Sequence, residues 1–399
     1  DSKNLEGIEH RYWHNLYGTY MQRATAEGLT KRSPKDAPAL RPFVLSRAFF
    51  TGSQRYGAIW TGDNTAEWGH LKIATPMLLS INLAGLSFAG SDVGGFFGEP
   101  SPELMTRWFQ AGAFTPFFRG HAHHDTKRRE PWVHGDEHTQ IRRKAAMLRY
   151  SLLPLWYTTF FEAYESGMPV MRPLFMEFPD DSGCFKMDDQ WMVGSALLVK
   201  PVTSDGVRDV DMYLPKRSGP WYDLETLAPI QQVSGGTVRM DAPLNKIPVL
   251  IRGGSIVPRK LRLRRSATLM YHDPLTLFVA PAADKTASCS LYMDDEKSLA
   301  HEMSNAGREN FVKRLFTFAD GKLTSAASDP DAIPAHAPAN VVERVVFLGQ
   351  NRAAKKVSLW SPDIDHVVLE STFDSNVGTI TVKRPNVLAA ADWEIRLEF

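Results

Sequence analysis

The chain has 399 residues, with 46 Lys or Arg and 45 Asp or Glu, so its formal net charge is only +1. Single hydrophobic cores stop growing near roughly 250 to 300 residues, so this length predicts two or three domains. The balanced charge argues against a nucleic-acid partner, and the 43% hydrophobic content argues against a disordered chain.

Helical and strand patterns alternate from the start of the chain to about residue 172. Strands interleaved with helices indicate parallel pairing, in an α/β barrel or a doubly wound sheet. Ser101 and Pro102 are typical of a helix start, as cap and first helical residue. The predicted strands cover residues 41–46, 58–62, 85–90 and 114–119, and the predicted helices cover 9–29, 68–83, a stretch from 102 onward and 137–166.

A polar side chain follows each of these four strands. These side chains are Arg47, Asp63, Asp92 and His121. Because all strands of a parallel barrel end on one rim, where such barrels carry out chemistry, we expect the four to face one pocket. Aspartate is also a favoured helix cap, so the residues alone leave open whether Asp63 caps the helix that follows.

Short β-rich runs replace the helices after about residue 173. Turn signals separate the runs, as in antiparallel sandwiches, and we place a boundary between two sandwiches near Lys260. The stretch 326–339 is predicted to be a surface loop. The runs cover residues 191–199, 207–214, 247–257, 275–279, 311–318, 341–348, 356–360 and 393–399.

Several features exclude other classes of protein. The longest apolar stretch, 75–90, contains polar residues and is shorter than the roughly 20 residues of a membrane span, so no span is expected. The basic run 259–265 alternates with leucine and is interpreted as a solvated strand face rather than a nucleic-acid site. Cys184 and Cys289 are too few for a disulfide framework or a metal site, and their redox state is left open.

Histidines gather after the fourth predicted strand. A zinc site needs three or four ligands that converge with defined geometry, and these candidates are crowded into a loop without a partner motif. We therefore expect no metal. The candidates are His121, His123, His124, Asp125, His134 and His138.

Four long segments resemble glycoside hydrolase family 31, the retaining α-glucosidases. They read FVLSRAFFTGSQRYGAIWTGDN, GLSFAGSDVGGFFGEP, PFFRGHAHHDTKRREPW and RYSLLPLWYTTFFEAYESGMPVMRPL. The resemblance implies a (β/α)8 TIM barrel followed by a proximal and a distal β-sandwich, without a metal or cofactor. This chain would then hold the second half of the barrel in residues 1–172, the proximal sandwich in 173–260 and the distal sandwich in 261–399.

The resemblance also implies roles for individual residues. Asp63 matches the general acid/base, which protonates the leaving oxygen and then deprotonates the attacking water. Burial by Trp60 and Phe96 would favour its protonated form. The substrate contacts would come from Arg47, Trp60, Asp92, Phe96, Arg119 and His121.

Each of these roles has a plain structural alternative. Arg47 could form an ion pair with Asp63 or Asp92. Trp60 and Phe96 could be ordinary core residues, and an isolated histidine such as His121 is more often structural.

The family's nucleophile, the aspartate of a Trp-Asn-Asp-Met-Asn-Glu-Pro motif, has no match in this sequence. A retaining glycosidase needs two carboxylates about 5 to 5.5 Å apart, so we expect this chain to be inactive alone. Half a barrel also exposes unpaired strand edges. We therefore expect a docked N-terminal fragment of the same catalytic subunit, produced by cleavage before Asp1, to carry the nucleophile.

Within the family, the resemblance implies removal of terminal α-1,3-linked glucose from glucosylated high-mannose N-glycans. It further implies the endoplasmic reticulum lumen as the location and a regulatory β-subunit as a partner. Two alternatives stay open. One is a family 31 α-glucosidase or α-xylosidase of other specificity, and the other is a carbohydrate-binding chain that lacks chemistry.

Overall fold

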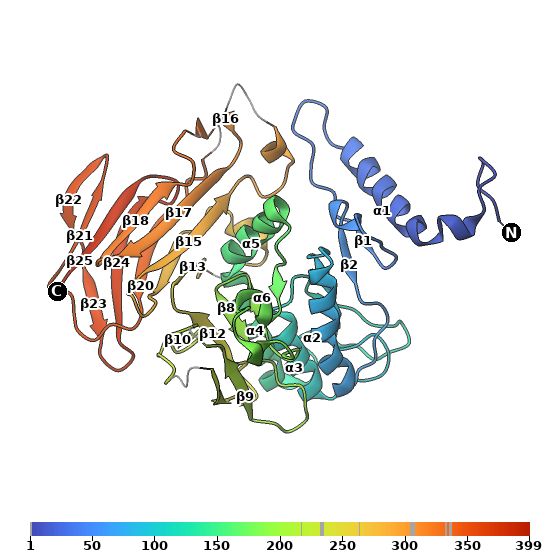
Figure 1. Cartoon of the computed structure of the whole chain (residues 1–399), viewed down its shortest axis with the longest axis horizontal. Helices are drawn as coiled ribbons and strands as arrows, with labels where there is room; N and C mark the ends of the chain where they lie inside the picture. Colours follow the sequence, from blue (N-terminus) through green and yellow to red (C-terminus); the bar gives the residue numbers. More distant parts are fainter. Residues whose placement is uncertain are drawn as a thin grey trace.

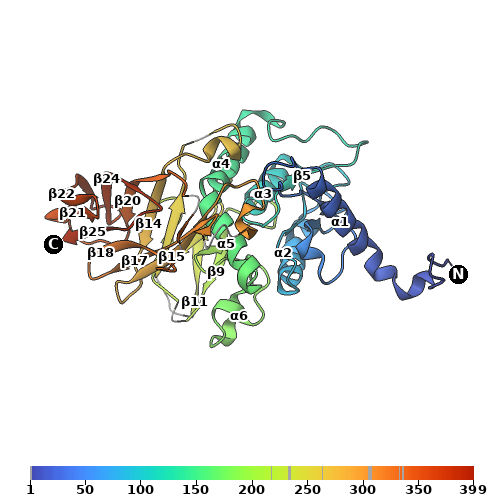
Figure 2. The ribbon, with the colours of Figure 1, turned by 90° about the horizontal axis from the view of Figure 1, so that it is seen from above.

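The computed structural model describes residues 2–399 except 217, 232–234, 263, 304–307, 332 and 335–336. An α/β part, a small antiparallel sheet and a large curved sheet follow one another along the chain (Figure 1). Seen from above, α1 and the large sheet lie at opposite ends, with α4 and α5 between them (Figure 2). None of the helices in the described part is long and apolar enough to cross a bilayer.

Short parallel strands alternate with helices in the α/β part. Strands β1, β2 and β3 pair in parallel in that order, and β4 pairs in parallel with β5. Parallel pairing is therefore confirmed, with strands shorter than their apolar runs. The elements are α1 (His14–Lys31), β1 (Leu45–Ser46), β2 (Ala58–Trp60), α2 (Trp68–Leu83), β3 (Ala89–Gly90), β4 (Asp92–Val93), α3 (Pro102–Gly112), β5 (Arg119–Gly120), α4 (Gly135–Ser151) and α5 (Leu153–Ser166).

The single helix predicted over 137–166 was wrong, because the structure has two helices there. Helix α4 ends at Ser151 and α5 begins at Leu153, with Leu152 between them outside the helical region. Pro154 explains the break, since proline lacks the N–H for a helical bond and its ring clashes with the carbonyl four residues earlier. It also disfavours helical geometry at the residue before it.

A five-stranded antiparallel sheet follows the α/β part, in the order β10-β12-β8-β7-β6, beside a two-stranded β9–β11 ladder. The buried Trp191 donates its indole N–H to the carbonyl of Phe114 at 3.0 Å, which joins this sheet to the α/β part. The elements are β6 (Met171–Arg172), α6 (Leu174–Glu177), β7 (Trp191–Val193), β8 (Leu197–Val199), β9 (Asp209–Leu214), β10 (Trp221–Asp223), β11 (Gly236–Asp241) and β12 (Val249–Arg252).

The rest of the chain forms an eleven-stranded sheet in the order β22-β21-β25-β18-β17-β15-β13-β14-β20-β24-β23. One buried cluster takes Leu277, Phe316 and Ile380 from distant strands, so the sheet curls around a single core. The sheet already includes β13, which ends one residue before Lys260. Its strands are β13 (Ser255–Arg259), β14 (Leu275–Ala280), β15 (Ala287–Met293), β17 (Val312–Ala319), β18 (Lys322–Ala327), β20 (Val341–Phe347), β21 (Lys356–Ser361), β22 (Ile364–Val368), β23 (Ser371–Asp374), β24 (Thr379–Leu388) and β25 (Trp393–Glu398), and β16 (Arg308–Glu309) pairs separately with β19 (Ile333–Pro334).

The basic run 259–265 does not form the strand face that its alternation predicted, although Arg262, Arg264 and Arg265 are exposed. The strand ends at Arg259, whose guanidinium donates to the Ser151 hydroxyl at 3.0 Å. Lys260 is buried and donates to the carbonyl of Tyr271 at 3.0 Å. Burial lowers the pKa of both cations. The chain leaves the sheet beside Ser151 at the end of α4, and the long aliphatic stems allow these cations to be covered.

Arg107 ties α3 to the small antiparallel sheet, and its replacement by Met is expected to lower the free energy of unfolding by about 3 kcal/mol. The Arg107 side chain is fully buried and donates to four backbone carbonyls. Methionine has no N–H group, so these carbonyls would lose their donor. Urea denaturation measures the loss, with Arg208→Met as the control, since that exposed partner of Glu103 should contribute less than about 1 kcal/mol. Equal losses would contradict this account. The carbonyls that Arg107 contacts, between 2.7 and 3.2 Å, are those of Val207, Ala242, Pro243 and Lys246.

Candidate active site

The four predicted polar side chains lie at the same edge of the parallel strands. Arg47 directly follows β1, Asp63 lies in the turn after β2, Asp92 opens β4 after β3, and His121 directly follows β5. The parallel pairing of these strands turns their carboxyl ends to one side. Asp92 is close enough to Asp63 and His121 for both to act on its pKa. The expected convergence is thus found for these three residues.

Asp92 is the most buried member of the group, with no exposed surface. Its Oδ1 accepts a hydrogen bond from Arg119 Nη2 at 2.5 Å. Its Oδ2 is also buried and has no hydrogen-bond partner within the part of the chain that is described. Burial raises the pKa of the Asp92 carboxyl, and the Arg119 guanidinium opposes that rise. Asp92 Oδ2 is therefore a buried acceptor with unused hydrogen-bonding capacity, which makes it a candidate for contact with a ligand hydroxyl.

Two aromatic residues form walls beside Asp92. The Arg119 guanidinium lies over the Trp60 ring at 4.9 Å, a cation–π contact that orients the indole. The Phe96 ring stacks on the His121 ring, with 5.3 Å between centroids. Trp60 and Phe96 are only half-buried, so the alternative of plain core packing does not describe them. Together they line one side of the rim.

Asn64 holds the rim loops together, a role that the sequence reasoning missed. Its Nδ2 donates to the carbonyl of Asp92 at 3.1 Å, and its Oδ1 accepts from the backbone N–H of Phe96 at 2.9 Å. An amide with donors and an acceptor can join two loops in this way. The available signal was its position directly after Asp63.

Arg129 supports the loop that contains Phe96, and the sequence reasoning missed this role too. This buried residue donates to the backbone carbonyls of Gly94, Gly95 and Gly98, on both sides of Phe96. Gly95 has φ +84°, and a Cβ there would lie 2.4 Å from the backbone nitrogen of Ala66. Only glycine fits this approach of the two loops.

Asp63 is exposed on the rim in this chain. It does not cap the following helix, because α2 begins at Trp68 with Glu67 as the N-cap residue. Nor do Trp60 and Phe96 bury it in this chain, because the residue is exposed. An exposed carboxylate at this edge is open to a ligand.

Arg47 is also exposed, and it lies beside the turn that ends β2. A Cβ added to Gly62 would be 3.5 Å from Arg47 Nε. Among the residues that the structure describes, Arg47 forms no ion pair with Asp63 or Asp92, so that alternative is not found. Its guanidinium projects from the same rim as the other site residues.

The histidines separate into different environments. His134 Nδ1 contacts Arg142 at 2.9 Å, and His138 Nδ1 contacts the Thr106 hydroxyl at 2.9 Å, so both belong to the packing of α3 against α4. The ligand atoms of His123, His124 and Asp125 lie within 4.8 Å of one another in the exposed loop. Three adjacent surface residues do not make the closed tetrahedral shell of a structural zinc site.

Two family descriptions match the chain. The glycosyl hydrolases family 31 TIM-barrel domain matches residues 1–159, and the glycosyl hydrolase family 31 C-terminal domain matches residues 167–257. The chain belongs to glycoside hydrolase family 31. Membership of family 31 confirms the predicted fold class, with part of a TIM barrel followed by β-domains.

Family 31 relatives match over the whole length of the chain. The neutral alpha-glucosidases AB of Dictyostelium discoideum and Homo sapiens are 46% identical over 399 residues, which is 100% of this chain and 41% of each relative. A crystal structure of glucosidase II alpha subunit has a TM-score of 0.92 and 41% identity, over 99% of this chain and 43% of that chain. A family 31 dextranase of Flavobacterium johnsoniae has a TM-score of 0.81 and 27% identity, over 100% and 50%. The chain thus spans half the length of these relatives or less.

Proposed function

We propose that this chain is the C-terminal part of a retaining exo-α-glucosidase that removes terminal α-1,3-linked glucose. The observation that carries the proposal is the placement of Asp63, Asp92 and His121 at one rim of a family 31 barrel, with the buried Asp92 Oδ2 lacking a hydrogen-bond partner among the described residues. The exposed carboxylate of Asp63 can supply the acid/base member of the pair of carboxylates that a retaining glycosidase needs.

Asp63 acts as the general acid/base in this proposal. It donates a proton to the glycosidic oxygen as the nucleophile attacks the anomeric carbon, so that the aglycone leaves as a neutral alcohol. In the second step it removes a proton from the water that cleaves the glucosyl ester. Arg47, Asp92 and His121 bind hydroxyls of the glucose, and the half-buried Trp60 and Phe96 wall the pocket. Arg119 orients Asp92 and Trp60.

The nucleophile comes from an N-terminal fragment of the same catalytic subunit. The sequence has no match to the family's nucleophile motif, and the curated relatives are more than twice as long. Exposed apolar rings in the α/β part support a docked partner: Phe43 is 63% exposed, and Phe88 is also exposed. Phe117 contacts both rings, so they belong to one apolar surface that a second half barrel would cover.

The names of relatives support a finer specificity. A 46% identical protein of Oryza sativa is named probable glucan 1,3-alpha-glucosidase. A solved structure with a TM-score of 0.92 and 41% identity is a heterodimeric complex of the ER glucosidase II catalytic subunit with the binding domain of the regulatory subunit. We therefore propose glucosylated high-mannose N-glycans as substrates, a regulatory β-subunit as partner and the endoplasmic reticulum lumen as location.

A linkage panel tests this specificity on the complete catalytic subunit. We expect kcat/KM for an α-1,3-linked glucosyl disaccharide to exceed that for the α-1,4 and α-1,6 isomers and for an α-xyloside by at least about tenfold. The linkage isomers misplace the leaving group, and the xyloside lacks the hydroxymethyl group, so each loses contacts with the rim. A solved family 31 α-xylosidase of Xanthomonas citri covers 87% of this chain with a TM-score of 0.75, so the xyloside is an informative comparison. Preference for the xyloside or for another linkage would contradict the proposed specificity and leave the family assignment intact.

A further inference from the structure

We propose that Asp294, in the loop after β15 of the large sheet, is a positioning residue that fixes Arg47 on the rim. The inference rests on the proposed function, because it concerns the placement of a sugar-binding side chain. Asp294 itself lies in a different part of the chain from the rim and contacts the segment that leads into β1. The large sheet would thereby set part of the geometry of the candidate active site.

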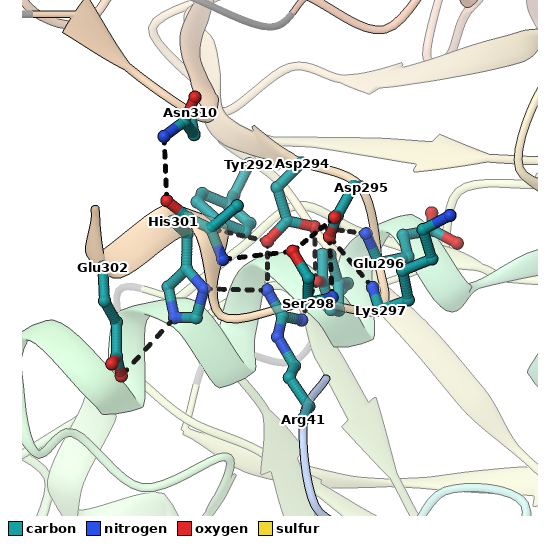
Figure 3. Close-up of polar contacts among 12 residues, drawn as sticks. Arg41, Tyr292, Asp294, Asp295, Glu296, Lys297, Ser298, His301, Glu302 and Asn310 are labelled. Carbon is teal, nitrogen blue, oxygen red and sulfur yellow. Dashed lines mark hydrogen bonds and ion pairs between the residues drawn. The ribbon is translucent and has the colours of Figure 1, made fainter. Parts of the chain in front are cut away.

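Asp294 is the centre of a buried polar cluster (Figure 3). The residue is only 2% exposed. Its Oδ1 accepts from the Tyr157 hydroxyl at 2.6 Å and its Oδ2 from the Tyr292 hydroxyl at 2.7 Å, while the Arg41 guanidinium pairs with Oδ2. The cluster joins α5, β15 and the segment before β1 through one carboxylate. Each of its oxygens is satisfied, as a buried charge requires.

Backbone hydrogen bonds hold the same segment against the Asp294 loop. Arg41 donates its N–H to the carbonyl of Lys297 at 3.0 Å, and Leu299 donates to the carbonyl of Ala39 at 2.7 Å. Residues 40 and 298 form an antiparallel bridge between these bonds. Asp295 braces the loop from within by accepting from the backbone N–H groups of residues 297 and 298. The loop therefore presents backbone groups in a fixed arrangement, to which residues 39–41 bind.

The anchored segment leads directly to Arg47. Beyond Arg41, the chain enters β1, which pairs with β2 over Leu45 and Ser46 alone, and Arg47 is the next residue. Two paired residues give little independent stability to a strand. The anchor at Arg41 therefore fixes one end of this stretch, and the β1–β2 pairing fixes the other. Loss of the anchor would remove the fixed point before β1, and Arg47 would then be held only by the two-residue pairing and the packing of Val44 and Ala48.

The charge of Asp294 is essential to the anchor. Burial would lower the pKa of Arg41, but contacts with Tyr157 and Asp294 reverse this and raise it. The guanidinium therefore stays charged, and its His301 contact at 3.1 Å adds a second polar neighbour. Asn at position 294 keeps the shape of the side chain but removes the ion-pair partner of the half-buried Arg41 guanidinium.

A double-mutant cycle on the complete catalytic subunit tests the proposal. Asp294→Asn should lower kcat/KM for the α-1,3-linked disaccharide about tenfold in the wild-type background and less than about twofold in an Arg47→Gln background, because coupled residues are not additive. Arg41→Gln removes the other partner of the ion pair and should behave in the same way. This second variant keeps the proposal testable if Asp294→Asn folds poorly. Equal fold-losses in both backgrounds would overturn the positioning role, since a general loss of stability does not depend on Arg47.

Hydrogen exchange gives a readout that needs no turnover, so failure of the proposed function would not leave the anchor untested. Asp294→Asn should speed exchange in peptides covering residues 41–60, because the anchored segment is then free to open. The matched control is Asp273→Asn, since Asp273 is similarly buried and pairs with Arg264 at 2.7 Å, away from the anchored segment. Unchanged exchange in the first variant, or the same change in the control, would overturn the proposal.

Discussion

Replacing Asp63 by Asn is expected to lower kcat/KM for an α-linked glucosyl disaccharide by about 10³-fold in the complete catalytic subunit, because the sugar alcohol leaves poorly without a proton. The loss should be much smaller for α-glucosyl fluoride, since fluoride departs without protonation. Measuring kcat/KM for both substrates separates a lost general acid from a lost binding contact, which would affect the two substrates alike.

Glu67→Gln is the matched control for Asp63. Glu67 is an exposed carboxylate four residues further along the same loop, and its side chain makes no capping hydrogen bond at the start of α2. We expect its kcat/KM to stay within about twofold of wild type, because surface substitutions away from special features have small effects. Near-normal hydrolysis of the disaccharide by Asp63→Asn would show that another residue supplies the proton.

Asp92→Asn is expected to lower kcat/KM by about 100-fold, or roughly 2.7 kcal/mol of transition-state stabilisation. In one orientation the new amide points its NH2 group toward Arg119 and loses the hydrogen bond with that guanidinium. In the other orientation the NH2 group replaces the acceptor oxygen Oδ2. Both orientations weaken a charge-assisted hydrogen bond. Steady-state kinetics and the affinity for a glucose-like inhibitor measure the effect. The loss should appear in both, because Asp92 binds the sugar rather than moving a proton.

Asp125→Asn is the control for Asp92. Asp125 is an exposed carboxylate in the loop after β5 and contacts His123 and His124. Its variant should retain wild-type kinetics, with or without a metal chelator. A loss equal to that of Asp92→Asn would assign the acidic requirement to the exposed loop and contradict the role of the buried carboxylate.

The position of the rim was predictable because it depends on local pattern. Each short apolar run ends at a polar residue, and parallel strands must end on one side, so the strand exits at Asp63, Asp92 and His121 could be placed together from the amino-acid sequence alone. The start of α3 was equally local: Ser101 accepts from the backbone N–H of Leu104, and Pro102 follows as the first helical residue.

The features that sequence reasoning missed all depend on contacts between distant parts of the chain. Asn64 and Arg129 hold loops whose paths are set by tertiary packing. Lys260 follows an alternating pattern yet is buried, because its backbone N–H bonds to Ser151 at the end of α4 and its ammonium bonds to the carbonyl of Tyr271. Arg41 and Asp294 are 253 residues apart, and no local pattern links them. The exposure of Asp63 depends on how much of the barrel this chain contains.

Glucose release from an α-1,3-linked glucosyl disaccharide, measured for this chain alone and for the chain co-expressed with its upstream segment, tests the central claim most directly. The account predicts turnover only in the combined sample, because the two carboxylates of a retaining glycosidase would then come from different polypeptides. Turnover by this chain alone, or no turnover in the combined sample, would contradict the account.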